Sequence, residues 1–209
     1  MSTKDWHPYT KYIIALSILG TLAFLFVGIG SATDFWITSR QENSTGHIVE
    51  SHSGLWRVCY KQAEPQLGYN CVNLDLKNVP EKGSPGYNYL ITMFALKSSS
   101  LLSIVLGMFL IFFGELVALF TLKIRRKSWF VAAGSFFLFG GFFILGGLCV
   151  YITMVLHESK WWPDELGSPP EAVVKFSWSF ALEWVGITLS FIVGGTYVWL
   201  SRLYVEDML

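Results

Sequence analysis

Long stretches without charge dominate the pattern of hydrophobic and polar positions. Four of them can cross the roughly 30 Å hydrocarbon layer of a bilayer as helices, since a crossing takes about 20 residues at about 1.5 Å each. The first exceeds the apolar region of a signal peptide and no A-x-A-like cleavage site follows it, so we interpret it as a retained span. The predicted transmembrane helices cover residues 12–32, 98–122, 129–156 and 176–200.

The short connection between the second and third spans predicts the orientation. Residues 123–128 hold four cations and no acid, and such loops stay in the cytoplasm. An even number of spans then places both termini in the cytoplasm and the loops 33–97 and 157–175 outside the cell. We therefore predict one tetraspan domain over residues 1–209, located in the plasma membrane.

The first outer loop contains pieces that alternate apolar and polar residues as strands do, at residues 35–39, 55–61 and 71–76. These pieces predict a small antiparallel sheet. The expected fold class is therefore an all-α membrane four-helix bundle with a small extracellular antiparallel β-sheet.

Small residues recur at helical spacing within the predicted spans, where close backbone packing holds membrane helices together. The fourth span has Gly186, Ser190 and Gly194, and the third has Gly134 with Gly141 and Gly140 with Gly147. We expect these rows to pack within this chain, with a contact between copies as the alternative.

Two of the three cysteines, Cys59 and Cys71, lie in the first outer loop. Exposure to an oxidising compartment predicts a disulfide between them, which would contribute about 3 kcal/mol by constraining the unfolded chain. A metal site with His47 or His52 is the alternative, but no paired metal-ligand spacing supports it, so we expect no metal. Cys149 is predicted to be a free thiol packed within the third span.

Asn43 begins the tripeptide Asn-Ser-Thr, which matches the acceptor for N-glycosylation. Its predicted position outside the cell makes this match usable. We therefore expect a glycoprotein.

Composition narrows the functional classes. The chain is 53% apolar and only 14% charged, and its 15 basic residues balance its 15 acidic ones. Soluble domains average about 25% charged residues, and nucleic-acid binding needs an excess of clustered cations. The lipid bilayer is thus an expected partner and nucleic acid is not. No enzyme motif or convergent catalytic set occurs, so we expect no enzymatic activity and no cofactor.

The order of Trp36, Gly54, Leu55, Trp56, Cys59 and Cys71 after a first span resembles the W-GLW-C-C signature of the claudin superfamily. That superfamily includes peripheral myelin protein, epithelial membrane proteins, lens fibre membrane intrinsic protein and calcium-channel gamma subunits. Residues 33–36 and 176–184 look most like the epithelial and lens branch. The resemblance implies a claudin-like fold, an outer antiparallel sheet over a left-handed four-helix bundle. It also implies a Cys59–Cys71 disulfide and a Gly54 to Trp56 segment at the membrane surface.

Glu115 and Glu183 lie within the second and fourth spans, where an acid at mid-bilayer costs roughly 2.5 to 3.5 kcal/mol. One interpretation is that each is protonated or hydrogen-bonded to Ser, Thr or Tyr within the bundle. The other is that one or both contact a polar residue in a partner's membrane helix.

Two functions remain open at this point. The first is cell-cell adhesion, junction formation or membrane organisation, with partners on the adjacent cell and a location at cell junctions. The second is an auxiliary, gamma-like subunit that modulates a channel or another membrane protein in the same membrane. A homo-oligomer in that membrane is a further possible assembly. A paracellular pore lined by Glu64 and Asp75 is a third, weaker possibility.

Overall fold

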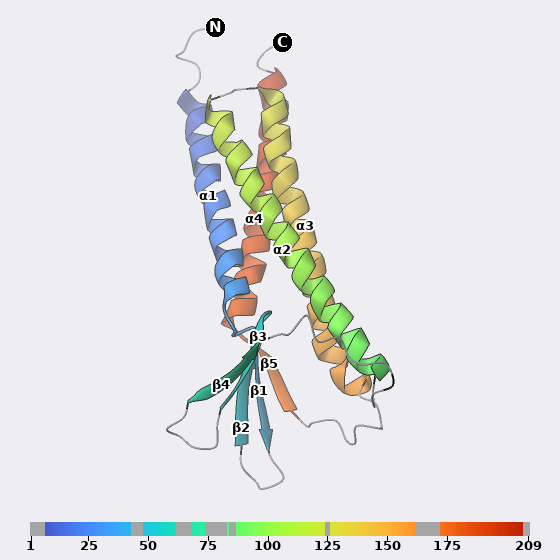
Figure 1. Ribbon diagram of the computed structural model, residues 1–209. Helices are drawn as coiled ribbons and strands as arrows, with labels where there is room; N and C mark the ends of the chain where they lie inside the picture. The colour runs from blue at the N-terminus through green and yellow to red at the C-terminus, as the bar shows by residue number, and fades with distance from the viewer. Residues whose placement is uncertain are drawn as a thin grey trace. The chain divides into compact units, whose positions relative to one another are not determined.

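The computed structural model describes residues 7–42, 48–61, 68–73, 83, 87–123, 126–161 and 172–206. Four long α-helices account for most of them (Figure 1). All four are long and apolar enough to cross a membrane, as the hydrophobic pattern predicts. Their bounds are α1 His7–Ala32, α2 Tyr87–Lys123, α3 Lys127–Trp161 and α4 Trp178–Glu206.

The second helix begins well before the predicted span. Helix α2 starts at Tyr87 and is 37 residues long, whereas the hydrophobic pattern placed the span at residues 98–122. Hydropathy locates the apolar part of a helix and not its first turn, because polar residues such as Asn88 and Lys97 continue a helix outside an apolar layer. The predicted loop 33–97 therefore ends before Tyr87 and is shorter than expected.

The chain divides into two compact units. The first unit holds residues 1–28, 103–145 and 184–209, which include most of each helix. Within it, α1 and α3 begin and α2 and α4 end at the same end (Figure 1). The four helical segments therefore alternate in direction through this unit, as successive crossings of a membrane require.

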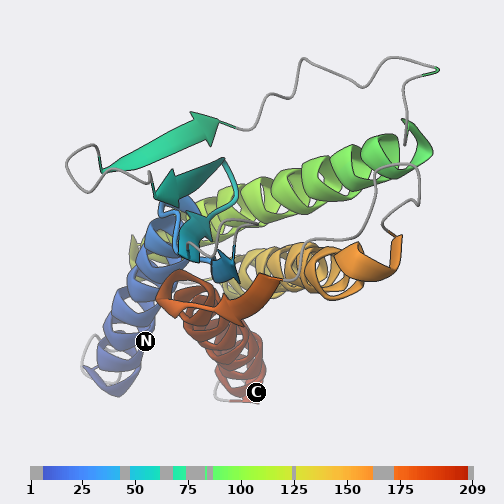
Figure 2. The same ribbon diagram turned by 90° about the horizontal axis from the view of Figure 1, so that it is seen from below.

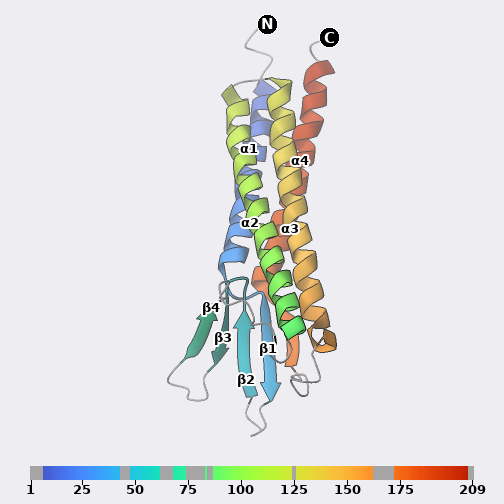
Figure 3. The same cartoon turned by 45° about the vertical axis from the view of Figure 1, so that its right-hand side comes forward.

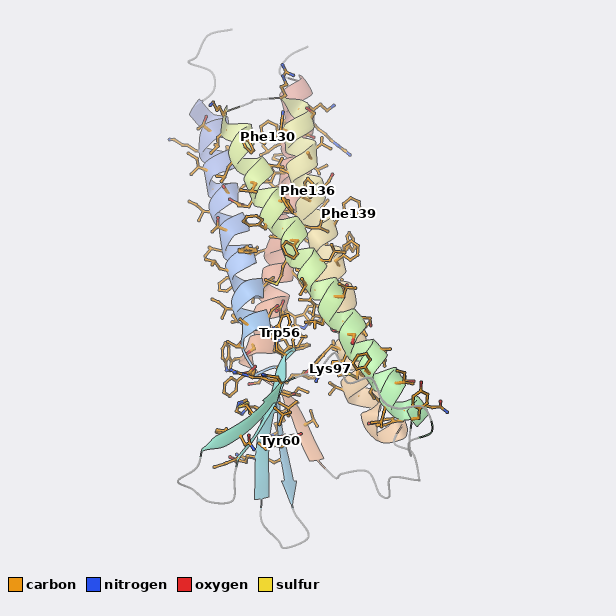
Figure 4. All side chains as sticks on the ribbon, viewed as in Figure 1. Trp56, Tyr60, Lys97, Phe130, Phe136 and Phe139 are labelled. Atoms are coloured by element: carbon orange, nitrogen blue, oxygen red, sulfur yellow. A yellow bond between two sulfur atoms is a disulfide. The ribbon has the colours of Figure 1, made fainter. Side chains whose placement is uncertain are left out.

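Glycines set the closest helix contacts in the first unit. A Cβ on Gly134 would lie 2.7 Å from the carbonyl oxygen of Gly194, and one on Gly140 would lie 2.9 Å from that of Gly107. Such distances mean that backbones touch, which is how membrane helices associate. The rows of small residues thus pack within the chain, as we expected. Phe139, on α3, instead points away from its neighbours and is 60% exposed (Figure 4).

The second unit holds residues 29–102 and 146–183, including a five-stranded antiparallel sheet (Figure 3). The strand order is β4-β3-β2-β1-β5, and β4 forms the edge away from β5 (Figure 2). The strands are β1 Ile37–Glu42, β2 Ile48–Ser53, β3 Arg57–Lys61, β4 Tyr69–Asn73 and β5 Ala172–Phe176. Three of them overlap the predicted strands; β2 and β5 do not.

Strand β5 corrects the predicted boundary of the fourth span. Phe176, the predicted first residue of that span, ends β5 and pairs with Ile37 of β1. Helix α4 starts two residues later, at Trp178. The short apolar run 172–176 joins directly to an apolar helix, so periodicity alone does not separate strand from span.

Candidate functional site

Trp36 lies at the centre of the core of the second unit. Its side chain is 0% exposed and packs edge-on against Tyr151 and Phe180, with ring centroids 4.9 and 5.8 Å away. Its indole Nε1 donates to the carbonyl oxygen of Gly30 at 2.8 Å, which satisfies the ring's one polar group. Trp36 is therefore a core residue of this unit.

The Gly54 to Trp56 segment connects β2 to β3 and packs on the end of α1. A Cβ on Gly54 would lie 2.7 Å from both the Cα of Asp34 and the carbonyl oxygen of Thr33, so only glycine fits there. Leu55 is buried. Trp56 is 42% exposed and its Nε1 donates to the carbonyl oxygen of Ser31 at 2.7 Å. Figure 4 shows Trp56 beside the last turn of α1, and Tyr60 further along the sheet.

The two indole hydrogen bonds both involve carbonyl groups at the end of α1. The last carbonyls of a helix have no partner within the helix, and the two indoles supply donors to Gly30 and Ser31. The family-signature residues Trp36 and Trp56 thus cap the first helix. This contact also fixes the position of the β2–β3 turn relative to the helix.

An ion pair strengthens the same junction. Arg57, the first residue of β3, donates through Nε to the carboxylate of Asp34, which is buried. A buried carboxylate needs such a partner because its charge is otherwise poorly solvated. No role for either residue is predicted from the sequence, although Arg57 directly follows the Gly54 to Trp56 motif.

Cys59 and Cys71 form a disulfide. They are directly opposite one another on the paired strands β3 and β4. The predicted bridge is confirmed, and these sulfurs are therefore not thiolate ligands for a metal. Cys149 is free, as predicted, but it is exposed, so the expectation that it packs within its helix bundle is wrong.

Glu183 is fully buried in the second unit. Its Oε1 accepts a hydrogen bond from the Ser31 hydroxyl at 2.6 Å, and a Cβ on Gly30 would lie 2.9 Å from the same oxygen. Glycine at position 30 therefore leaves room for the carboxyl group. Its Oε2 has no hydrogen-bond partner among the described residues.

Glu115 has a similar environment in the first unit. Its Oε1 accepts from the hydroxyls of Ser17 and Thr21 on α1, and its Oε2 is buried without a partner in the described part of the chain. Both acids therefore bind hydroxyl groups of α1, which is the first of the two interpretations given above. The serines and threonine involved were missed, although they are polar residues within an apolar span.

Several predicted residues lie outside the described residues, namely Asn43, His47, Glu64 and Asp75. The glycosylation and pore interpretations that depend on them remain expectations. Within the described residues, no group of three or more His, Cys, Asp or Glu side chains is arranged to hold a metal ion. His52 instead stacks on Phe35, with ring centroids 4.4 Å apart.

Comparison with known proteins connects these features to a family. A family model described as "PMP-22/EMP/MP20/Claudin tight junction" matches residues 21–198. That range contains the signature tryptophans, the disulfide and both intramembrane acids.

Similarity to individual proteins extends over most of the chain. The chain is 26% identical over 205 residues to the voltage-dependent calcium channel gamma-5 subunit of Mus musculus, covering 92% of this chain and 71% of that protein. It is 25% identical over 204 residues to the gamma-7 subunit of Homo sapiens, covering 91% of this chain and 70% of that protein.

Proposed function

Because this chain belongs to the PMP-22/EMP/MP20/Claudin family, we propose that it is a non-enzymatic auxiliary subunit, which binds a channel or another membrane protein in the same membrane and modulates it. The observation that carries this proposal is the similarity over 92% of the chain to a protein named as a channel gamma subunit. Such similarity includes the helices as well as the sheet, so it supports a partner that lies alongside in the bilayer.

The exposed helix surfaces suit lateral association. Leu102 and Phe109 on α2 and Phe139 and Phe142 on α3 are each at least 57% exposed. Apolar side chains gain little when they exchange lipid contacts for contacts with another helix, so association depends on shape and on polar contacts. These faces are therefore able to contact either lipid or a partner's helices.

Affinity purification from native membranes in mild detergent tests the proposal. We expect a large multi-span channel protein to co-purify, and its currents to change when the two are expressed together. Recovery of this chain alone, or only with copies of itself, would contradict the auxiliary-subunit function.

Cell adhesion or junction formation is the second candidate, favoured by the words "tight junction" in the description of the matching family. It predicts enrichment at cell contacts only when both apposed cells express the protein. Mixed cultures of expressing and non-expressing cells separate the two functions, because a partner in the same membrane does not depend on the neighbouring cell.

We further propose that the sheet lies outside the cell and both termini lie in the cytoplasm of a plasma-membrane protein. The disulfide supports this orientation because oxidising compartments retain disulfides, and the basic residues 123–128 support it through the positive-inside rule. On this orientation Asn43 is glycosylated, so glycosidase treatment should shift the mobility of the wild type but not of Asn43→Gln. Antibody access to an epitope inserted after Arg126 in intact cells would contradict the orientation.

The intramembrane acids are proposed to act within the chain and not as docking groups. Their free oxygens are buried, so a partner's side chain does not reach them without separation of the helices. Glu115→Gln and Glu183→Gln should therefore co-purify with the partner as the wild type does. Loss of the partner with either folded variant would favour the docking interpretation instead.

A further inference from the structure

One face of the sheet carries a cleft that the family signature does not explain. The cleft has a volume of about 550 Å³ and is partly open. Its lining includes three rings, Phe35, His52 and Tyr69, and three charged side chains, Arg40, Glu50 and Lys175. All six belong to the second unit, and they come from four strands and the segment before β1.

Strand register explains why these side chains gather. Thr38 of β1 is opposite His52 on one side and Lys175 on the other. Arg40 lies two residues further along β1, opposite Glu50. Residues two apart share one face of a strand, so the cations of β1 and β5 flank the same cleft.

The described side chains that line the cleft carry more positive than negative charge. Glu50 is the one carboxylate among the described lining residues, and both of its oxygens are engaged, by Arg40 at 3.1 Å and by Lys61 at 3.3 Å. Glu42, at the end of β1, shares the same face by register but is not among those described lining residues. Lys175 is exposed and makes no ion pair within the described ranges. Two cations, Arg40 and Lys175, therefore line the cleft beside one described acid, and Lys175 has no ion-pair partner among these groups.

The ion pairs that Glu50 makes are easily exchanged. The Arg40 side chain is 75% exposed and that of Lys61 is 52% exposed, and exposed pairs contribute little to stability. Arg40 uses one nitrogen of its guanidinium on Glu50, which leaves the other donors able to bind a carboxylate.

The rings provide apolar contact area beside these cations. Phe35 stacks on His52 with an interplanar angle of 9°, and His52 meets Tyr69 edge-on at 4.7 Å. Tyr69 is 49% exposed and Phe35 is 38% exposed. The cleft thus presents a row of partly exposed rings next to unpaired positive charge.

We propose that this cleft binds an acidic peptide segment of the partner membrane protein, in which a carboxylate side chain neighbours an aromatic or aliphatic one. The carboxylate binds Lys175 and Arg40, and its apolar neighbour packs on Tyr69 and Phe35. The identification of the occupant as a partner protein's segment depends on the function proposed above. The binding chemistry of the cleft does not.

Direct binding to the full chain in phosphatidylcholine nanodiscs tests the proposal. The probes are a fluorescent Glu-Phe-Glu-Phe-Glu-Phe peptide and its Gln-Phe-Gln-Phe-Gln-Phe counterpart. We expect the acidic peptide to bind and the amide peptide to bind at least about tenfold more weakly, since hydrogen bonds between charged groups contribute that much. Equal affinity for the two peptides would overturn the proposal.

Three variants locate the site. Lys175→Gln combined with Arg40→Gln should weaken acidic-peptide binding about tenfold or more. Glu50→Gln should strengthen it, because it releases Arg40 and Lys61 and removes a repelling charge. Lys123→Gln removes an exposed cation at the end of α2, outside the cleft, and should leave binding unchanged. An unchanged affinity of the double variant, with its disulfide intact, would overturn the site.

Two further results separate this proposal from others. Phosphatidylserine in the nanodiscs tests for lipid binding. If it abolishes binding of the acidic peptide to the wild type, but not binding of a control peptide that contacts the protein outside the cleft, the cleft binds lipid headgroups and the peptide assignment is wrong. If the peptide binds as expected but no channel co-purifies, the proposed binding site is supported and the proposed auxiliary-subunit function is contradicted.

Discussion

At Gly54 the backbone of one loop touches the backbone of another. A Cβ there would lie 2.7 Å from the Cα of Asp34 and from the carbonyl oxygen of Thr33. Neither atom is the end of a flexible side chain, so the added methyl group moves the whole turn.

We therefore predict that Gly54→Ala lowers the free energy of unfolding by about 1 to 3 kcal/mol, the usual cost of overpacking. Unfolding of the detergent-solubilised protein by denaturant measures it. Gly195→Ala is the matched control, because nothing lies within 4 Å of that position and alanine favours a helix. Equal stability of the two variants would show that the Gly54 turn adjusts without strain.

His52 is expected to make the stability of the folded protein fall as the pH is lowered. Burial lowers the pKa of His52 below its ordinary value of 6.5, while the carboxylate of Asp34 raises it and the guanidinium of Arg57 lowers it by smaller amounts. The other ionisable groups on its face of the sheet are Glu42, Glu50, Arg40, Lys61, Lys175 and Tyr69. Because the folded pKa is depressed, the unfolded state binds the proton more readily, and stability falls as the pH drops below the unfolded value.

We predict that the thermal midpoint of the wild type falls between pH about 7.5 and about 5.5 by more than that of His52→Gln. The difference between the two proteins isolates this histidine from the other groups that titrate. If the two profiles run parallel, His52 does not contribute to the pH dependence of folding.

At the scale of elements, the contact between α3 and α4 in the first unit rests on paired glycines. A Cβ on Gly134 would lie 2.7 Å from the carbonyl oxygen of Gly194, and one on Gly194 would lie 2.9 Å from that of Gly134. Each helix therefore packs its backbone against the other's glycine.

We predict that Gly134→Ala and Gly194→Ala each destabilise the protein, by about 1 to 3 kcal/mol, and that the double variant loses less than the sum. The first methyl group already separates the helices, so the second meets less resistance, which is the expected behaviour of residues in contact. Additive losses in denaturant unfolding would mean that the two positions act independently.

The disulfide holds β4 to the sheet. All five residues of β4 are exposed, so this strand gains little from burial and depends on its pairing with β3. We predict that Cys59→Ser, Cys71→Ser and the double variant each lose about 3 kcal/mol. Cys149→Ser, which removes the exposed free thiol, should unfold as the wild type does. A larger loss in the double than in the single variants would indicate a role for the thiols beyond the bridge.

The strands show where prediction from sequence succeeds and fails. The alternating pieces 55–61 and 71–76 predict strands that overlap β3 and β4. Strand β2, with the sequence Ile-Val-Glu-Ser-His-Ser, has no such alternation and is stabilised by its two neighbours. Strand β5 is formed by pairing with β1, a contact between segments far apart in the sequence.

At the scale of the whole molecule, the hydrophobic pattern predicts four spans because a bilayer demands long apolar helices. The tertiary partners of single polar residues are harder to predict from the sequence. Asp34 needs Arg57, and Glu183 needs Ser31, yet neither pair has a local spacing that reveals it. The cleft on the sheet is hidden for the same reason, since Lys175 reaches it only through β5.

The position of β1 between β2 and β5 has a consequence for biosynthesis. Four of the five strands emerge from the ribosome before the second helix, whereas the fifth follows the third. Until residues 172–176 are made, β1 exposes an unpaired row of backbone donors and acceptors, which is the kind of edge that recruits other chains. A nascent or truncated chain that stops before Ala172 should therefore aggregate or be retained by quality control, while one that stops after α4 should mature.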